Sequence, residues 1–348
     1  MGGDEFLAAV ARPRGDPSPR ALAERMLAFA RRPLSLDEDV VRFGMSIGIA
    51  RQPLEAFDLD ALQVEADLAM YQAKRGGKNQ IHEYDSELRS RAVRNKTLSD
   101  ELRCAVERDE FAPFFQTQHD ARTGAVVGAE ALVRWRHPER GVLTPDRFLP
   151  VAEKIGIVKH IDLTVMRRAA EAARRLEEKG LILPKLNVNV SLPRLRDPDL
   201  AASIASLPLS ATALSFEILE AVFLDEFDDL TRFQFDRLRE MGVTLEIDDF
   251  GTGRTSIVAL TRLEPDRIKI DRELARDVAT DATQRRIVQS IVDMAASLKV
   301  GTTVEGVETR AQAEVLADLG VGALQGFLFG EPCDEAELER RLRGLAAA

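Results

Sequence analysis

The chain has 348 residues, 45% of them hydrophobic, and its 48 Lys and Arg against 58 Asp and Glu give a formal net charge of −10. This acidic balance argues against non-specific binding to nucleic acid, and no secretory signal or apolar run of membrane-spanning length is found, so we expect a cytoplasmic protein with any tether upstream of Met1. The two cysteines, Cys104 and Cys333, form neither a disulfide framework nor a zinc-binding pattern.

Residues 1–85 form the first predicted part of the chain. They contain the sequence Gly-Gly-Asp-Glu-Phe at 2–6, a helix, a strand at 41–50 and a second helix at 61–77. Residues 86–102 are rich in charge and contain neither Pro nor Gly, which predicts a helical linker.

From residue 103 to residue 348, short apolar strands alternate with amphipathic helices such as 283–298. Strands are predicted at 111–118, 126–135, 185–192, 213–220, 243–250, 267–271, 302–308 and 323–330. Eight such units favour a (β/α)8 barrel of parallel strands over an open doubly wound sheet, because no glycine-rich dinucleotide-binding turn follows any strand.

Polar residues interrupt the apolar pattern near the carboxyl ends of several predicted strands. Helices cover the outside of such a barrel, so these side chains point into its interior, on the face where barrel enzymes place their active sites. Buried and unpaired, each would cost several kcal/mol, so they must satisfy one another, bind a ligand or hold a metal. Each also has a purely structural explanation: Lys269 could neutralise an acid pair, Asn189 could link two strands, and Glu305 could cap a helix.

The composition of this polar set predicts a metal site. The candidate ligands offer only oxygen atoms: Glu130, Asn189, Glu217, Asp248 and Asp249. Oxygen ligands favour Mg²⁺ or Mn²⁺ over Zn²⁺, and several carboxylates suit two ions, which together can activate water for in-line displacement at phosphorus. The adjacent Asp248 and Asp249 would then reach different sides of a metal pair.

Seven motifs, in order, resemble those of the EAL-domain cyclic di-GMP phosphodiesterases. They are EALVRW (130–135), NVNVS (187–191), FEILE (216–220), DDFGTG (248–253), KID (269–271), EGVE (305–308) and QGFLFGEP (325–332). The resemblance implies a TIM-like barrel that hydrolyses cyclic di-GMP to linear pGpG with Mg²⁺ or Mn²⁺. It also implies a homodimer formed through the barrel.

The resemblance implies a role for individual residues. The metal ligands would be Glu130, Asn189, Glu217, Asp248, Asp249 and Glu305. Lys269 and Glu305 would position or deprotonate the metal-bound water, and Glu220 would order the loop that follows DDFGTG. The substrate contacts would be Gln116, Arg134, Gln325 and Glu308.

Three positions depart from the family pattern: Leu219 replaces the usual threonine, Arg254 a tyrosine, and Thr117 a proline. Leu219 and Arg254 adjoin the loop that must be ordered for catalysis, so the alternative function is a weak or inactive cyclic di-GMP receptor that uses the same pocket. Without the resemblance, a barrel glycosidase or a Mg²⁺-dependent enolising enzyme also stays open, although a single tryptophan, Trp135, and a lysine among acids do not suit a glycosidase.

Residues 1–85 resemble the second half of a GGDEF domain, the α+β fold of diguanylate cyclases. The matching segments are GGDEF (2–6), FGMSIGIA (43–50) and ADLAMYQAKRGGKNQIHEYD (66–85), with Asp4 and Glu5 as the acids of the nucleotide and metal site. Because Met1 directly precedes the motif, we expect a fragment or remnant of that domain with apolar edges exposed and no cyclase activity.

Overall fold

The computed structural model describes residues 5–10, 18–36, 39–52, 58–219, 229–251, 260 and 263–346. The chain divides into two compact units, Met1–Leu98 and Ser99–Ala348. Among the helices that the structure describes, none combines the length and apolar composition needed to cross a membrane.

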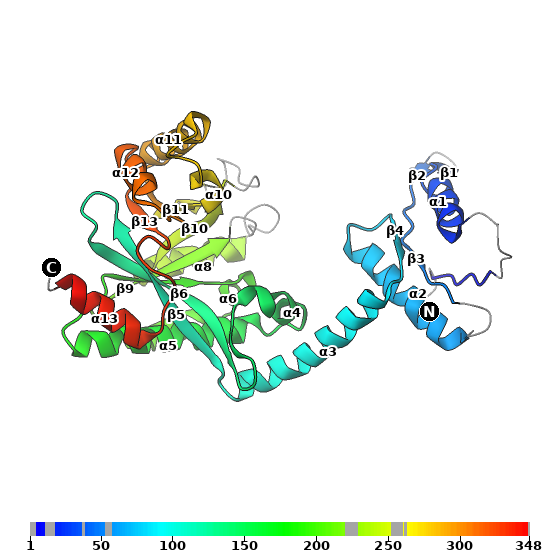
Figure 1. Ribbon diagram of the computed structural model, residues 1–348, viewed down its shortest axis with the longest axis horizontal. Coiled ribbons are helices and arrows are strands. Elements are labelled where there is room, and N and C mark those ends of the chain that lie inside the picture. Colours follow the sequence, from blue (N-terminus) through cyan, green and yellow to red (C-terminus); the bar gives the residue numbers. More distant parts are fainter. Residues whose placement is uncertain are drawn as a thin grey trace. The chain divides into compact units, whose positions relative to one another are not determined.

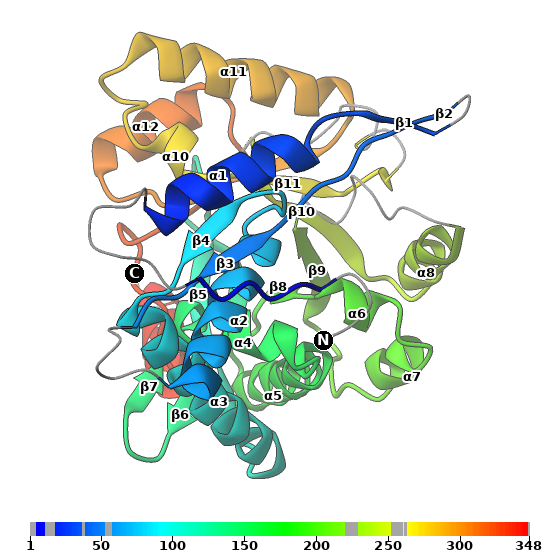
Figure 2. The same ribbon diagram turned by 90° about the vertical axis from the view of Figure 1, so that its right-hand side faces the viewer.

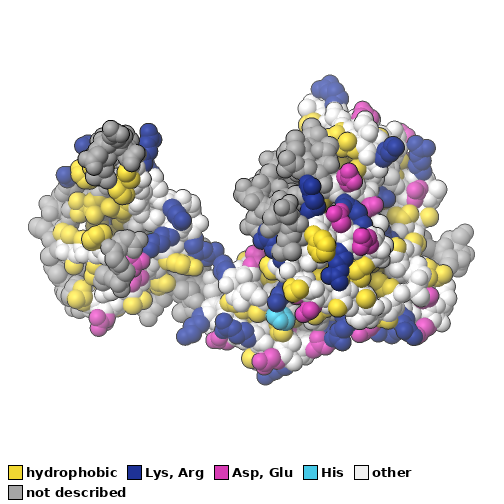
Figure 3. All heavy atoms as spheres, turned by 180° about the vertical axis from the view of Figure 1, so that it is seen from behind, with side chains coloured by type: hydrophobic (Ala, Val, Ile, Leu, Met, Phe, Trp, Pro, Cys, Tyr) yellow, Lys and Arg dark blue, Asp and Glu magenta, His cyan; other side chains and the backbone are white. Residues whose placement is uncertain are grey.

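The first unit is a small α+β arrangement. Its elements are α1 (Pro19–Ala30), β1 (Leu34–Leu36), β2 (Asp39–Val41), β3 (Ile47–Ile49), α2 (Leu59–Arg75) and β4 (Ile81–Glu83). Strands β3 and β4 pair in parallel, and both α1 and α2 contact them (Figure 2). The predicted strand at 41–50 is therefore shorter in the structure. Apolar side chains stay exposed on this unit, among them Phe6, Phe29 and Phe43. Figure 3 shows hydrophobic side chains on the surface of this unit.

The segment predicted as a helical linker is helical. Helix α3 runs from Ser86 to Glu107, beyond the predicted end at residue 102. The division between the two units falls within this helix.

Side chains cap the N-termini of α1 and α2 in the first unit. Ser18 accepts a hydrogen bond from the Ala21 N–H, and Asp58 accepts from the Asp60 and Ala61 N–H groups.

The second unit is the predicted barrel (Figure 1). Its strands are β5 (Phe111–Asp120), β6 (Val126–His137), β8 (Lys185–Asn189), β9 (Ala213–Leu219), β10 (Thr244–Phe250), β11 (Arg267–Ile270), β12 (Gly301–Val304) and β13 (Ala323–Gln325). The pairing order is β5-β13-β12-β11-β10-β9-β8-β6, and β6 pairs again with β5, which closes the ring. A short strand outside the ring, β7 (Gly141–Leu143), pairs antiparallel with the end of β6.

One strand departs from the prediction of parallel strands throughout. β5 runs antiparallel to both of its neighbours, β6 and β13. A parallel connection needs a crossover of a dozen or more residues, whereas only residues 121–125 separate β5 from β6. That turn is stabilised by Asp120, whose Oδ1 accepts from the N–H groups of Arg122 and Thr123, and by Gly124 at φ 71°.

Helices cover the outside of the barrel (Figure 1). They are η2 (Pro145–Arg147), α4 (Leu149–Lys154), α5 (Val158–Glu178), α6 (Leu192–Leu195), α7 (Leu200–Ala205), α8 (Asp229–Glu240), α10 (Arg272–Ala275), α11 (Ala282–Ser297), α12 (Arg310–Asp318) and α13 (Glu335–Ala346). Helix α5 shows the expected pattern, since Ile161, Val165, Ala169 and Leu176 form a buried stripe at helical spacing. Helix α11 coincides with the helix predicted at 283–298.

Two predicted strands end early at glycines. The strand predicted at 302–308 stops at Val304, and Gly306 has φ 65°. The strand predicted at 323–330 stops at Gln325, and Gly326 has φ 159°. Glycine adopts these conformations without steric cost, so the chain turns at the mouth of the barrel and places Glu305 and Glu308 on loops.

Candidate active site

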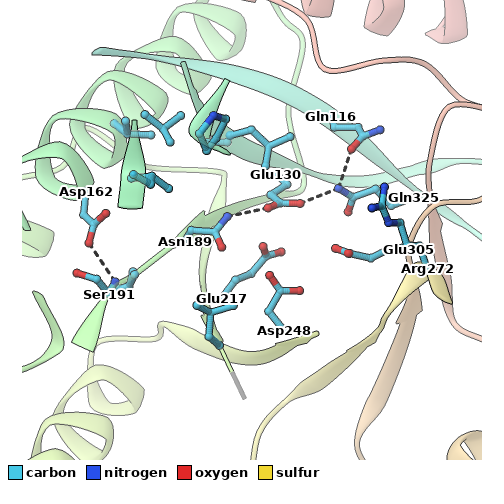
Figure 4. Close-up of a pocket in the computed structure, with 18 of the residues that line it drawn as sticks. Gln116, Glu130, Asp162, Asn189, Ser191, Glu217, Asp248, Arg272, Glu305 and Gln325 are labelled. Atoms are coloured by element: carbon cyan, nitrogen blue, oxygen red, sulfur yellow. Dashed lines mark hydrogen bonds between the residues drawn. The ribbon is translucent and has the colours of Figure 1, made fainter. Parts of the chain in front are cut away.

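Several of the polar side chains predicted to point into the barrel line one cavity of about 490 Å³ at the carboxyl ends of the strands (Figure 4), and Lys269 and Asp249 are not among its lining residues. Glu130 comes from β6, Asn189 from β8, Glu217 from β9 and Asp248 from β10. Glu305 follows β12, and Gln325 ends β13. Because these strands are neighbours in the ring, residues far apart in sequence meet at one edge of the barrel.

Lys269 lies at the centre of the acids, fully buried on β11. Its Nζ is 2.5 Å from Glu305 Oε1 and 2.8 Å from Glu217 Oε2. The same atom is 3.1 Å from Asp248 Oδ1 and 3.3 Å from Glu130 Oε2. An ammonium group has three N–H donors and one positive charge, so it cannot satisfy four carboxylates at once. The arrangement therefore has room, in charge and in hydrogen bonding, for further cations.

The acids respond differently to this crowding. Burial would raise the pKa of Glu130, but Lys269 and the amides of Gln325 and Asn189 lower that pKa to about 2. Burial and repulsion from Glu130 raise the pKa of Glu217 well above its ordinary value. Burial also raises the pKa of Glu305 to about 7, although Lys269 opposes the shift. The raised pKa values of Glu217 and Glu305 favour their protonated forms, and bound cations would displace those protons.

A chain of side-chain amides fixes the orientation of Glu130. Asn189 Nδ2 donates to its Oε1 and Gln325 Nε2 to its Oε2, both at 2.7 Å. Gln325 Nε2 is also 3.1 Å from Gln116 Oε1, and Gln118 Nε2 donates to Gln325 Oε1 at 2.9 Å. Two predicted substrate contacts, Gln116 and Gln325, therefore belong to the network that holds a predicted metal ligand.

The carboxylates form two groups with the spacing of metal ligands. In the described part of the chain, one group is Glu130, Glu217 and Asp248, and the other is Asp248, Asp249 and Glu305. Within each group, the candidate ligand atoms lie within 4.8 Å of one another. Asp248 belongs to both groups, which is the arrangement that a shared ligand between two ions requires.

The backbone explains how two successive aspartates reach the same site. Asp249 has φ 55°, and the pairing of β10 with β11 shifts in register between Ile247 and Phe250. This irregularity breaks the alternation that would send successive side chains to opposite faces of a strand. Burial and the neighbouring Asp248 raise the pKa of Asp249, as expected for two acids brought together.

The remaining predicted residues do not all line the cavity. Glu308 lines the cavity, but Arg134 does not: its Nη1 donates to the Val133 carbonyl at 2.8 Å, and its guanidinium lies over the Phe114 ring. Glu220, Arg254 and Asp4 lie outside the described residues. Glu5 of the first unit forms an ion pair with Lys74 at 2.9 Å.

The structure adds site residues that the sequence analysis did not select. Gln118 shares a strand face with Gln116, and Asn187, which donates to Glu217 Oε1 at 2.8 Å, shares one with Asn189. In each case the residue lies two positions from a predicted site residue on the same strand, so the alternation of side chains along the strand could have identified it. Arg272 and Asp162 also line the cavity. Arg272 begins α10 just after β11, and Asp162 lies on α5, so neither shares the spacing of residues along a strand.

Comparison with known protein families gives two matches. A model of the EAL domain matches residues 99–332, and a model of the GGDEF domain, described as diguanylate cyclase, matches residues 1–80. Both families are those that the sequence motifs resemble, so the resemblance is confirmed.

Curated relatives match almost the whole chain. The bifunctional diguanylate cyclase/cyclic di-GMP phosphodiesterase MucR of Pseudomonas aeruginosa is 35% identical over 343 residues, which are 97% of this chain and 50% of MucR. The cyclic di-GMP phosphodiesterase PdeR of Escherichia coli is 31% identical and is matched over 97% of this chain and 51% of PdeR. The chain thus spans about half the length of the curated relatives that it matches.

Solved structures share the barrel. The MucR phosphodiesterase in complex with c-di-GMP superimposes with a TM-score of 0.64 at 36% identity, over 70% of this chain and 99% of that one. BlrP1 of Klebsiella pneumoniae, in a complex with manganese and cyclic di-GMP, gives a TM-score of 0.56 at 31% identity, over 64% of this chain and 56% of that one.

Proposed function

Because the chain belongs to the EAL-domain family, we propose that it hydrolyses one phosphodiester bond of cyclic di-GMP to give linear pGpG. The observation that carries this proposal is the pair of carboxylate groups that share Asp248 in the barrel cavity. The relatives named as cyclic di-GMP phosphodiesterases support the choice of substrate.

The donor set fits two divalent cations, Mg²⁺ or Mn²⁺. Glu130, Asn189, Glu217 and Asp248 would hold one ion, and Asp248, Asp249 and Glu305 the other. When bound, such ions supply an acidified water and neutralise phosphate charge. The excess of carboxylates over the single ammonium of Lys269 supports this fit, as does the manganese complex of the related BlrP1.

The chain's own residues then have distinct tasks. Glu305, with its pKa raised to about 7, can accept or release a proton near neutral pH. Lys269 keeps its charge, because the surrounding acids raise its pKa well above the ordinary value despite burial, and it stabilises negative charge that develops on phosphate oxygens. Glu220 would order the loop after the two aspartates, and Gln116, Gln325 and Glu308, which line the cavity, would contact substrate. Arg134 would contact substrate only after its guanidinium leaves the Phe114 ring. We also assign residues 103–348 to the catalytic barrel. From the family resemblance, we propose that the barrel forms a homodimer.

A receptor that binds cyclic di-GMP without hydrolysing it is the second candidate. Leu219, at the position where the family usually has threonine, lines the cavity with half of its surface exposed. This observation bears on the rate of hydrolysis, because the position ends a strand that carries a predicted metal ligand, Glu217.

The test is hydrolysis of cyclic di-GMP with Mn²⁺ or Mg²⁺, with the product separated by chromatography. We expect pGpG from the parent chain, no product in excess EDTA, and a loss on the order of 10²-fold or more in kcat for Asp248→Asn. Asp281→Asn is the matched control, because Asp281 caps α11 away from the cavity and asparagine also caps helices.

Each outcome separates the candidates. Binding of cyclic di-GMP by the parent without any pGpG would establish the receptor instead of the enzyme. Full activity in EDTA would contradict the metal assignment, and parent-like turnover of Asp248→Asn would contradict the location of the site.

A further inference from the structure

The cavity is strongly acidic for a pocket proposed to take an anion. Among the described residues that line it, seven are Asp or Glu, and one, Arg272, is a cation. Lys269 lies beneath the acids and is already paired with four of them. Cyclic di-GMP carries two phosphodiester groups, each with one negative charge. The cations that the metal-ligand acids would hold neutralise only the phosphodiester group that reacts. The other phosphodiester group needs a cation of its own.

The guanidinium group of Arg272 is not paired with an acid in the described part of the chain. Arg272 is exposed, and no hydrogen bond or ion pair joins its side chain to another residue in the described part of the chain, although seven acids line the same cavity. A guanidinium group presents several N–H donors in a fixed fork that matches phosphate oxygens. Its donors are therefore available to a ligand.

The neighbouring backbone restricts the direction of the Arg272 side chain. Asp271 caps α10 by accepting from the Glu273 N–H at 2.8 Å, which fixes the chain at the strand end. Gly306 lies against the side chain: a Cβ atom added there would overlap the Arg272 Cβ and come within 3.5 Å of its Cγ. The stem thus passes over the Gly306 backbone, next to Glu305, at the wall of the cavity (Figure 4).

We infer that Arg272 binds the phosphodiester group of cyclic di-GMP that is not hydrolysed. This inference rests on the proposed function and makes Arg272 a substrate-binding residue, since the reacting group is held by the acids and their cations on the floor of the cavity. Its contribution is to binding, so losing it should raise KM and leave kcat nearly unchanged.

The first experiment compares the parent with Arg272→Ala, Arg272→Lys and Arg276→Ala in steady-state hydrolysis of cyclic di-GMP. Charge-assisted hydrogen bonds of this kind predict a KM about 10- to 100-fold higher for Arg272→Ala, with kcat within about 3-fold of the parent. Arg272→Lys keeps the charge without the fork, so its KM should lie between the two. Arg276→Ala removes a cation from the end of the same helix, outside the cavity lining, and should match the parent.

The second experiment uses the linear dinucleotide GpG as a competitive inhibitor. GpG keeps both guanines and the phosphodiester group that hydrolysis leaves intact, and it lacks the reacting phosphate. Arg272→Ala should therefore bind GpG more weakly than the parent does, by a factor similar to that for cyclic di-GMP. Raising the salt concentration should increase the KM of the parent more steeply than that of Arg272→Ala, because an exposed charge pair is screened.

An unchanged KM in Arg272→Ala, or a fall in kcat alone, would overturn the inference while leaving the proposed function intact. Unchanged inhibition of Arg272→Ala by GpG would also overturn it, because Arg272 would then contact the reacting phosphate, which GpG lacks. If the parent neither binds nor hydrolyses cyclic di-GMP, the proposed function fails, and the inference fails with it. Thermal unfolding confirms folding of each variant, and Arg272→Gln replaces Arg272→Ala if the latter is unstable.

Discussion

Lys269 shows how one buried charge depends on partners that sequence neighbours cannot supply. Its four carboxylates come from β6, β9, β10 and the loop after β12, and the nearest, Glu305, is 2.5 Å away. The alternation of polar and apolar residues predicted that each points inward. The convergence of all four on one ammonium follows from the order of strands in the ring.

Asp162, on α5, gives a prediction of pH dependence. Burial raises the pKa of its carboxyl to about 6, although the Ser191 N–H donates to it at 3.0 Å. Between the unfolded value of about 3.9 and about 6, the unfolded chain is ionised while the folded chain keeps the proton, so stability falls as the pH rises. Asp162→Asn removes this penalty and keeps an acceptor for Ser191. We predict that it raises the free energy of unfolding by about 3 kcal/mol at about pH 7.5, and changes it little at about pH 4.

Urea denaturation at both pH values measures the effect. Asp197→Asn is the control with the opposite sign, because the Asp199 N–H and Arg194 lower the pKa of Asp197, so ionised Asp197 stabilises the fold above its unfolded pKa. Equal stability of Asp162→Asn and the parent at both pH values would contradict a raised pKa of Asp162.

At the scale of elements, the sequence predicted which segments are barrel strands but not how all of them run or end. Apolar runs and amphipathic helices located the eight strands, because burial imposes those patterns locally. The reversed direction of β5 depends on the length of its connection to β6, and the early ends of β12 and β13 depend on backbone angles at Gly306 and Gly326. Among site residues, the acids were predicted from their motifs, whereas Arg272 has no local signal and becomes visible only through the cavity that it lines.

Helix α12 yields a prediction, because its first turn supports a cavity loop. Gln312 is buried, and its Oε1 accepts from the N–H groups of Glu308 and Thr309 at 2.9 and 2.8 Å. Its Nε2 donates to the Arg276 carbonyl at 2.8 Å. We predict that Gln312→Ala lowers the free energy of unfolding by about 2 kcal/mol, because it removes three hydrogen bonds made by a buried amide. Chemical denaturation tests this, with Gln289→Ala on α11 expected to cost less than about 0.5 kcal/mol; equal costs would contradict it.

At the scale of the whole molecule, the described site residues between Gln116 and Gln325 all belong to the second unit. This unit has its own closed sheet and its own covering helices, so it should fold by itself. We predict that residues 86–348, which keep α3 intact, hydrolyse cyclic di-GMP with a kcat within about twofold of the full chain. Steady-state kinetics checks this, after circular dichroism has confirmed folding. A folded but inactive barrel would show that the first unit contributes to catalysis.

The antiparallel strand β5 also sets an order of events during folding. Its pairing with β6 closes a short hairpin, whereas its pairing with β13 joins Asp120 to Ala323, across most of the barrel sequence. Because the entropy lost in closing a loop grows with its length, the hairpin forms early and the junction between β5 and β13 forms late. Gln325 on β13 donates to Glu130, and its hydrogen bonds with Gln118 and Gln116 on β5 cross that junction. A barrel that has not yet closed therefore lacks one of the two amide hydrogen bonds that orient Glu130, so the site is completed only when the ring closes.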